Sequence, residues 1–202
     1  APEHKYPGPL NDCFEALQWC MKYAATLGID SKRIILGGSS SGGNLTAALA
    51  QKVRDEGIEG VIGQAINIPV TCNFAYYPND KYELNSHVQN ADAPMMTTRV
   101  IQTFWDNYLQ HPGQGKEPYA SPLLATSFKG LPPALIQVAG LDPLRDEGLA
   151  YAEALRADGV SVRLQTYQGL PHGFSLIPGL KKRLDTTKNT LQWIQDLENG
   201  KL

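Results

Sequence analysis

The chain has 202 residues, with 18 Lys and Arg against 20 Asp and Glu, so its formal charge is −2. This balance excludes the clustered basic composition of a nucleic-acid binder, and no apolar run approaches the roughly 18 residues that a membrane-spanning helix needs. Hydrophobic residues at 42% and charged residues at 19% are typical of a chain that folds around a hydrophobic core.

Apolar periodicity predicts alternating helices and strands, the pattern of an α/β sheet covered on both faces. The first helix is expected to begin at a cap, Asn11 or Asp12, and to end at Gly28. Strands are predicted over residues 33–37, 62–70, 134–139 and 161–167, and further helices over 43–55, 147–157 and 180–197. Four strands with intervening helices make about half of a large doubly wound, mostly parallel sheet.

A long connection, residues 72–133, separates the second and third predicted strands. It far exceeds the roughly 2 to 6 residues usual for such loops, so we interpret residues 73–118 as a functional insertion. Within it, residues 97–109 show helical spacing of large apolar side chains, at Val100, Ile101, Phe104, Trp105 and Tyr108.

The chain ends and the cysteines bear on where the protein works. Cys13, Cys20 and Cys72 form neither a metal-ligand spacing nor an even-numbered disulfide framework. This favours a reducing compartment, and so a cytoplasmic protein, or simple buried thiols. The opening, residues 1–4, has no initiator methionine and no signal pattern. We interpret residues 1–202 as a single, incomplete domain cut from a longer chain.

The segment Gly38-Ser39-Ser40-Ser41-Gly42 carries the strongest chemical signal. It follows a predicted strand and opens a predicted helix, which is the context of a G-x-S-x-G nucleophile elbow. Only Ser40 has a glycine two positions before and two positions after it, so Ser40 is the candidate nucleophile. The alternatives are a simple glycine-serine turn or a phosphate cradle at a helix N-terminus.

A serine nucleophile needs a base and an orienting carboxylate, which in this type of fold follow in the order serine, acid, histidine. Asp142 comes directly after the third predicted strand, and His172 comes in the loop after the fourth. Asp142 precedes a proline and could instead start a turn or cap a helix. Asp146 is a rival carboxylate, although its place in a first helical turn suits the helix dipole.

These motifs resemble those of the hormone-sensitive-lipase-like group of α/β-hydrolase carboxylesterases. The opening Ala1-Pro2-Glu3-His4 resembles the group's LAPEHPFP segment, Gly38 to Leu45 its GDSAGGNL elbow, and Ala120 to Leu123 its ASPL segment. The run from Asp142 to Gly148 and the run His172-Gly173-Phe174 match its acid and base motifs. The resemblance implies the C-terminal portion of an α/β-hydrolase fold, with residues 73–118 contributing a helical cap or a pocket helix.

The resemblance also implies roles for individual residues. Ser40 would be the nucleophile, His172 the general base and acid, and Asp142 the orienting acid, with the Ser41 N–H in the oxyanion hole. The group's HGGG motif, whose glycines supply further oxyanion donors, does not occur in this sequence, and Ser39 stands where the group usually has Asp. We expect the segment that carries HGGG to be required for stability and full activity, supplied either as a second chain or as an N-terminal part of a longer chain.

The function implied is a serine carboxylesterase that hydrolyses short- to medium-chain esters through an acyl-enzyme, with no metal and no organic cofactor. The expected partner is a small-molecule ester, and a homodimer is a further expectation. An amidase or thioesterase with the same triad is one alternative. A non-catalytic ligand receptor on the same fold is another, which the presence of His172 disfavours.

Overall fold

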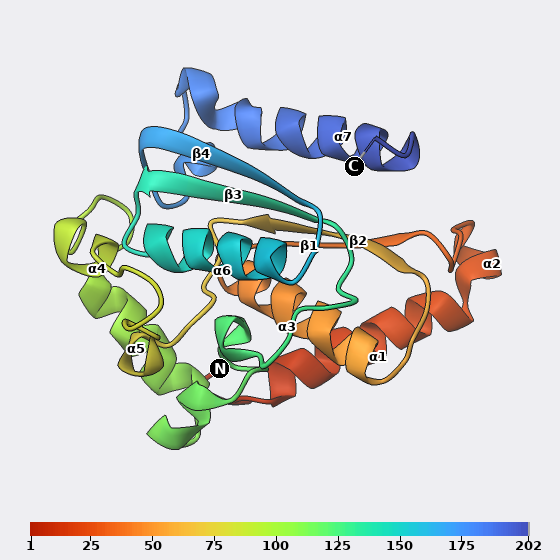
Figure 1. Ribbon diagram of the computed structural model, residues 1–202, viewed down its shortest axis with the longest axis horizontal. Coiled ribbons are helices and arrows are strands. Elements are labelled where there is room, and N and C mark those ends of the chain that lie inside the picture. Colours follow the sequence, from red (N-terminus) through yellow and green to blue (C-terminus); the bar gives the residue numbers. More distant parts are fainter. Residues whose placement is uncertain (202) are drawn as a thin grey trace.

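A four-stranded parallel sheet forms the centre of the computed structural model, which describes residues 1–201 (Figure 1). The strands lie side by side in chain order, and every neighbouring pair is parallel. This arrangement confirms the predicted parallel α/β sheet. The strands are β1 (Ile34–Ser39), β2 (Val61–Asn67), β3 (Ala134–Leu141) and β4 (Val162–Pro171).

Helices cover both faces of the sheet, as a doubly wound fold requires. The helices α3 (Ser41–Asp55) and α6 (Arg145–Ala157) pack on one face, and α7 (Asp185–Glu198) lies across the other (Figure 1). Trp193 of α7 is fully buried against β2. It fits there because residue 63 is glycine: a Cβ at that position would lie 2.8 Å from the Trp193 ring.

The first helix differs from its prediction at its start and in its continuity. It begins at Gly8, as α1 (Gly8–Lys22), rather than after a cap at Asn11 or Asp12, and neither of those residues caps it. No side chain caps the start of α1. Pro9 in the first turn favours the start instead, because its φ angle is already set for a helix. The helix is interrupted at Tyr23 and resumes as the short α2 (Ala24–Leu27). This second helix ends as predicted at Gly28, which has the left-handed conformation.

All four strands end at other residues than predicted, and β1 and β3 each run two residues further, to Ser39 and Leu141. β2 stops at Asn67 rather than Val70, because Ile68 has a φ of 40° that no strand continues. β4 runs on to Pro171, past a bulge at Gly169, whose φ is 72°. Gly140 of β3 lets the bulge approach closely, since a Cβ there would lie 3.0 Å from the Gly169 nitrogen. The residue predicted in a loop, His172, therefore follows a strand directly.

The connection between β2 and β3 holds two helices, α4 (Ser86–Gln89) and α5 (Thr98–Tyr108). α5 matches its predicted range, and the Thr97 side chain caps it by accepting the Val100 N–H. Short 3₁₀ turns account for much of the remaining regular structure, at Phe74–Tyr76, Pro112–Lys116, Pro122–Leu124, Phe174–Leu176 and Lys181–Leu184.

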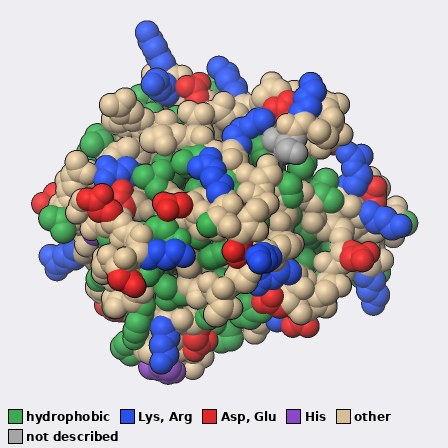
Figure 2. Space-filling view, in the orientation of Figure 1, with side chains coloured by type: hydrophobic (Ala, Val, Ile, Leu, Met, Phe, Trp, Pro, Cys, Tyr) green, Lys and Arg blue, Asp and Glu red, His purple; other side chains and the backbone are tan. Residues whose placement is uncertain are grey.

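The face of the molecule seen in Figure 2 carries its charges without large blocks of one sign. Figure 2 shows Lys and Arg side chains scattered over the visible face with Asp and Glu between them. Among the described residues, no helix is long and apolar enough to cross a membrane. Cys13, Cys20 and Cys72 are all free thiols, and Cys72 is buried.

Candidate active site

Ser40 sits at the sharp turn between β1 and α3. Its φ of 57° and ψ of −119° are a conformation that a non-glycine residue adopts only under strain. Backbone hydrogen bonds hold it there: the Ser40 N–H donates to the Asn67 carbonyl at 2.9 Å, and the Ser40 carbonyl accepts the Val70 N–H at 3.4 Å. The turn thus places the Ser40 side chain at the carboxyl edge of the sheet.

The two glycines that flank Ser40 have different physical reasons to be there. A Cβ at Gly38 would lie 2.1 Å from the Gly42 carbonyl oxygen, whereas a Cβ at Gly42 would meet no atom within 4 Å. Of the two positions, only residue 38 has no room for a side chain, because the start of α3 packs directly on the end of β1.

Asp142 and His172 lie side by side because the strands before them are paired. Leu141 of β3 is in register with Pro171 of β4, so the next residue of each strand emerges at the same edge. The Asp142 Oδ2 lies 2.6 Å from the His172 Nδ1, and the His172 Nε2 lies 2.9 Å from the Ser40 Oγ. The three residues singled out from sequence thus form one continuous chain of hydrogen bonds.

Burial and a second hydrogen bond fix the Asp142 carboxylate. The residue is 1% exposed, and its other oxygen, Oδ1, accepts the Leu144 N–H at 3.0 Å. Asp142 therefore does form a turn: one carboxylate oxygen closes the turn while the other contacts the imidazole.

Asp146 is engaged away from the histidine. Its Oδ2 accepts the N–H groups of Asn85 and Ser86, each at 2.8 Å, and its Oδ1 lies 2.7 Å from the Arg145 Nε. Burial acts to raise the pKa of Asp146, but the Arg145 guanidinium and the two N–H groups together lower that pKa below its ordinary value. This carboxylate fastens the insertion to the start of α6.

Sequence reasoning missed a neighbouring buried pair, Glu147 and His87. Glu147 is fully buried, its Oε1 accepts the N–H groups of Thr71 and Cys72, and its Oε2 lies 3.3 Å from the His87 Nε2. Burial raises the pKa of Glu147, although His87 and both N–H groups oppose the shift. A signal was present: Glu147 lies one helical turn before the buried Tyr151, on the apolar face of α6.

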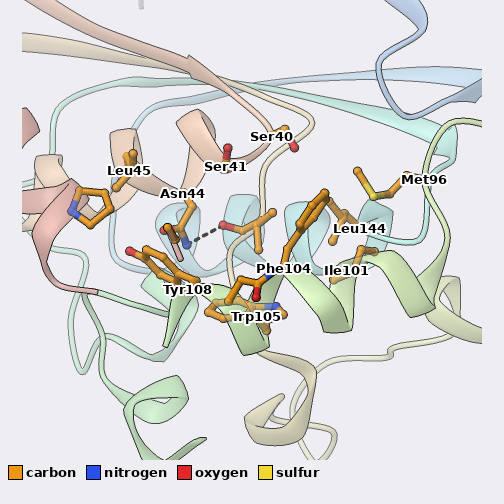
Figure 3. A pocket seen from close by; sticks show the side chains of 14 residues that line it. Ser40, Ser41, Asn44, Leu45, Met96, Ile101, Phe104, Trp105, Tyr108 and Leu144 are labelled. Atoms are coloured by element: carbon orange, nitrogen blue, oxygen red, sulfur yellow. Dashed lines mark hydrogen bonds between the residues drawn. The ribbon is translucent and has the colours of Figure 1, made fainter. Parts of the chain in front are cut away.

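A cavity of about 410 Å³ opens beside Ser40 (Figure 3). Ser40 and Ser41 lie at one side of it, and Phe104 rises from α5 toward that side (Figure 3). The Ser41 N–H is the first of α3 and so has no partner within the helix. The rest of the lining is mainly apolar and includes Leu45, Val70, Met96, Ile101, Trp105, Tyr108 and Leu144.

The fold and this edge of the sheet match a known family. The family described as alpha/beta hydrolase fold matches residues 1–176. The chain belongs to this family. The match agrees with the resemblance of its elbow, acid and base motifs to the hormone-sensitive-lipase-like group.

Relatives of this alpha/beta hydrolase chain include named esterases. Carboxylesterase NlhH of Mycobacterium tuberculosis is 38% identical over 179 residues, which cover 86% of this chain and 53% of the relative. The structure titled bacterial heroin esterase is 37% identical with a TM-score of 0.87, covering 98% of this chain and 62% of that one. Vibralactone cyclase has a TM-score of 0.89 and 30% identity, covering 98% and 59%. The chain spans about half the length of the curated relatives it matches.

Proposed function

We propose that the protein is a serine hydrolase of carboxylic esters, with Ser40, His172 and Asp142 as its catalytic triad. The observation that carries this proposal is the 2.9 Å contact between the Ser40 hydroxyl and the His172 Nε2, backed by Asp142 at 2.6 Å. The relatives named as carboxylesterases support the choice of an ester substrate.

The geometry suits acyl transfer in two halves. In the first half, the Ser40 Oγ attacks the ester carbonyl carbon while the His172 Nε2 takes the hydroxyl proton. The bond to the alcohol oxygen then breaks, and His172 returns the proton to the leaving alcohol. In the second half, water attacks the acyl-serine by the same route and releases the acid. Asp142 holds the imidazole in one tautomer and stabilises its protonated form.

The negative oxygen that forms on the substrate carbonyl needs hydrogen-bond donors. We assign the N–H of Ser41, which has no partner within the helix, to this role, since it adjoins the nucleophile at the start of α3. The resemblance to the carboxylesterase group implies that glycine N–H groups of an HGGG segment add to it. Each such donor contributes about 10²- to 10³-fold to the rate.

The cavity suggests which esters fit. Its walls are mostly aliphatic and aromatic side chains, which favour an apolar acyl group, and its volume suits short to medium chains. α5 supplies Ile101, Phe104, Trp105 and Tyr108 to these walls, so we propose that residues 73–118 contribute the helix that closes the acyl pocket.

Labelling with a fluorophosphonate tests the nucleophile, because this reagent bonds covalently to an activated serine. We expect the wild type to be labelled and to hydrolyse p-nitrophenyl esters, and Ser40→Ala to lose both properties. Ser39→Ala and Ser41→Ala are matched controls that should keep labelling. The Ser39 hydroxyl accepts a hydrogen bond from the Asn67 Nδ2 at 3.2 Å, away from the triad, and alanine keeps the N–H at position 41. Equal labelling of the wild type and Ser40→Ala, or none of the wild type, contradicts the proposal.

A panel of ester, amide and thioester substrates with one acyl group tests the reaction class. The proposal expects the ester to have the highest kcat/KM. A preference for the amide or the thioester would assign the same triad to a different reaction.

A further inference from the structure

The loop that carries Asp142 is held by a segment more than fifty positions earlier in the sequence. We call residues 140–146, which run from the last residues of β3 to the first residues of α6, the acid loop. The Asn90 Nδ2 donates to the carbonyl of Asp142 at 3.0 Å and to the carbonyl of Gly140 at 3.3 Å. Asn90 follows α4 directly and is 6% exposed, so water does not substitute readily for these bonds.

Ser86 makes a second tie between α4 and the acid loop. Its hydroxyl donates to the Pro143 carbonyl at 2.6 Å and accepts the Asp146 N–H at 3.2 Å. The side chain is fully buried. Figure 1 shows α4 beside the beginning of α6, where the acid loop ends. Together Ser86 and Asn90 bond to the acid loop at its start, its middle and its end.

The hydrogen bonds from Ser86 and Asn90 come from outside the acid loop, whereas others join residues within it. Arg145 also donates to the carbonyls of Gly140 and Asp142, but it belongs to the loop and moves with it. Asn90 belongs to a separate segment, which Thr98 anchors by donating its hydroxyl to the His87 carbonyl at 2.6 Å. Asn90 can therefore fix the loop relative to the rest of the molecule.

We propose that Asn90, assisted by Ser86, is a positioning residue that sets the orientation of Asp142 toward His172. The proposal rests on the proposed function, because it assigns Asn90 a role that acts through the triad acid. Asn90 donates its two hydrogen bonds to carbonyls at and beside Asp142, so its loss lets the carboxylate tilt away from the His172 Nδ1. A displacement of about 1 Å at a catalytic group can cost about 10²-fold in rate.

The first test compares Asn90→Ala with Gln51→Ala in the full chain. Gln51 is a matched control because it is also buried and its amide donates to the Pro122 carbonyl at 2.8 Å, outside the acid loop. We expect both variants to lower the melting temperature. Only Asn90→Ala should lower kcat, by about 10- to 100-fold, with KM changed little. A loss within about twofold, or an equal loss in both variants, overturns the proposal.

A double-mutant cycle separates positioning from a general structural role. Asn90→Ala should cost almost nothing further in kcat when Asp142→Ala is already present, because its effect runs through that carboxylate. The same fold-loss in both backgrounds would show that Asn90 acts independently of Asp142.

Proton NMR reads the geometry without turnover. We expect the wild type and Gln51→Ala to show a far-downfield resonance from the proton between His172 and Asp142, and Asn90→Ala to shift or broaden it. An unchanged resonance contradicts the proposal. If Asn90→Ala does not fold, Ser86→Ala carries the same expectations through Pro143. A wild type that fluorophosphonate does not label refutes the proposed function instead, and the NMR result then still reports whether Asn90 orients Asp142.

Discussion

At the scale of single residues, the backbone conformation of Ser40 depends on the absence of a side chain at Gly38. Ser40 is held at positive φ by backbone bonds to β2 and the segment after it, and the turn closes only because residue 38 has no side chain. The strain is local, and the packing of α3 on β1 maintains it. The motif is therefore a requirement of packing as much as of chemistry.

Replacing Gly38 by alanine tests this requirement. The added Cβ would lie 2.1 Å from the Gly42 carbonyl oxygen, so α3 must shift away from β1. We expect Gly38→Ala to lower the free energy of unfolding in urea by about 3 kcal/mol. Gly42→Ala is the control: its Cβ meets open space, and it should raise that free energy by up to about 1 kcal/mol through helix propensity. Equal effects of the two changes would contradict the packing argument.

At the scale of elements, α5 both packs against the protein and lines the cavity, and Ile101 and Trp105 take part in both. Ile101 and Trp105 are buried in a hydrophobic cluster with Tyr6, Leu109 and Leu144, which holds the helix in place. Phe104 lines the cavity and is 57% exposed, so it contributes little to that cluster. A substitution at Phe104 can therefore change the size of the cavity without weakening the packing of α5 in that cluster.

Phe104→Ala tests whether α5 limits the acyl chain. Removing the ring enlarges the cavity beside Ser40, so we expect the kcat/KM ratio of longer to shorter acyl esters to rise by about 10-fold. The melting temperature should stay nearly constant. Val100 lies on the same helix, is partly exposed and does not line the cavity. Val100→Ala should therefore leave the preference for acyl-chain length unchanged. A shifted preference in Val100→Ala, or none in Phe104→Ala, contradicts this role.

At the scale of the whole molecule, carboxylates at the start of α6 join the insertion to the sheet domain. Asp146 binds the N–H groups at the start of α4, and Glu147 binds those of the segment after β2. These two acids bring residues 71–72 and 85–87 against one end of α6. The stability of the folded chain should therefore respond to the ionisation of Asp146.

The pH dependence follows from the direction of the shift. The pKa of Asp146 is lower in the folded chain than its ordinary value of 3.8, so its stabilisation is complete above about pH 4 and is lost as the pH falls through the folded-state pKa. We expect Asp146→Asn to cost about 1 to 2 kcal/mol at pH 6 and progressively less below pH 4, measured by urea unfolding. The exposed control Asp12→Asn should cost little at either pH. A cost for Asp146→Asn that does not change with pH would disprove this role.

The sequence by itself determined the alternation of strands and helices, the elbow at Ser40, and the order in which Asp142 and His172 follow. These features are local, because apolar periodicity and glycine spacing act within a few residues. Its predictions of the start of α1 and of the end of β4 were wrong, because a proline replaced the expected cap and a bulge carried the strand past its predicted end.

Only the tertiary structure decided how residues far apart in the chain meet. It gave different partners to Asp142 and Asp146, which lie four positions apart in one motif, because β3 directs one toward β4 and α6 directs the other toward α4. It also brought Asn90 and Ser86 to the acid loop and His87 to Glu147. No local pattern marks Asn90, because its partners are backbone carbonyls, which every residue has.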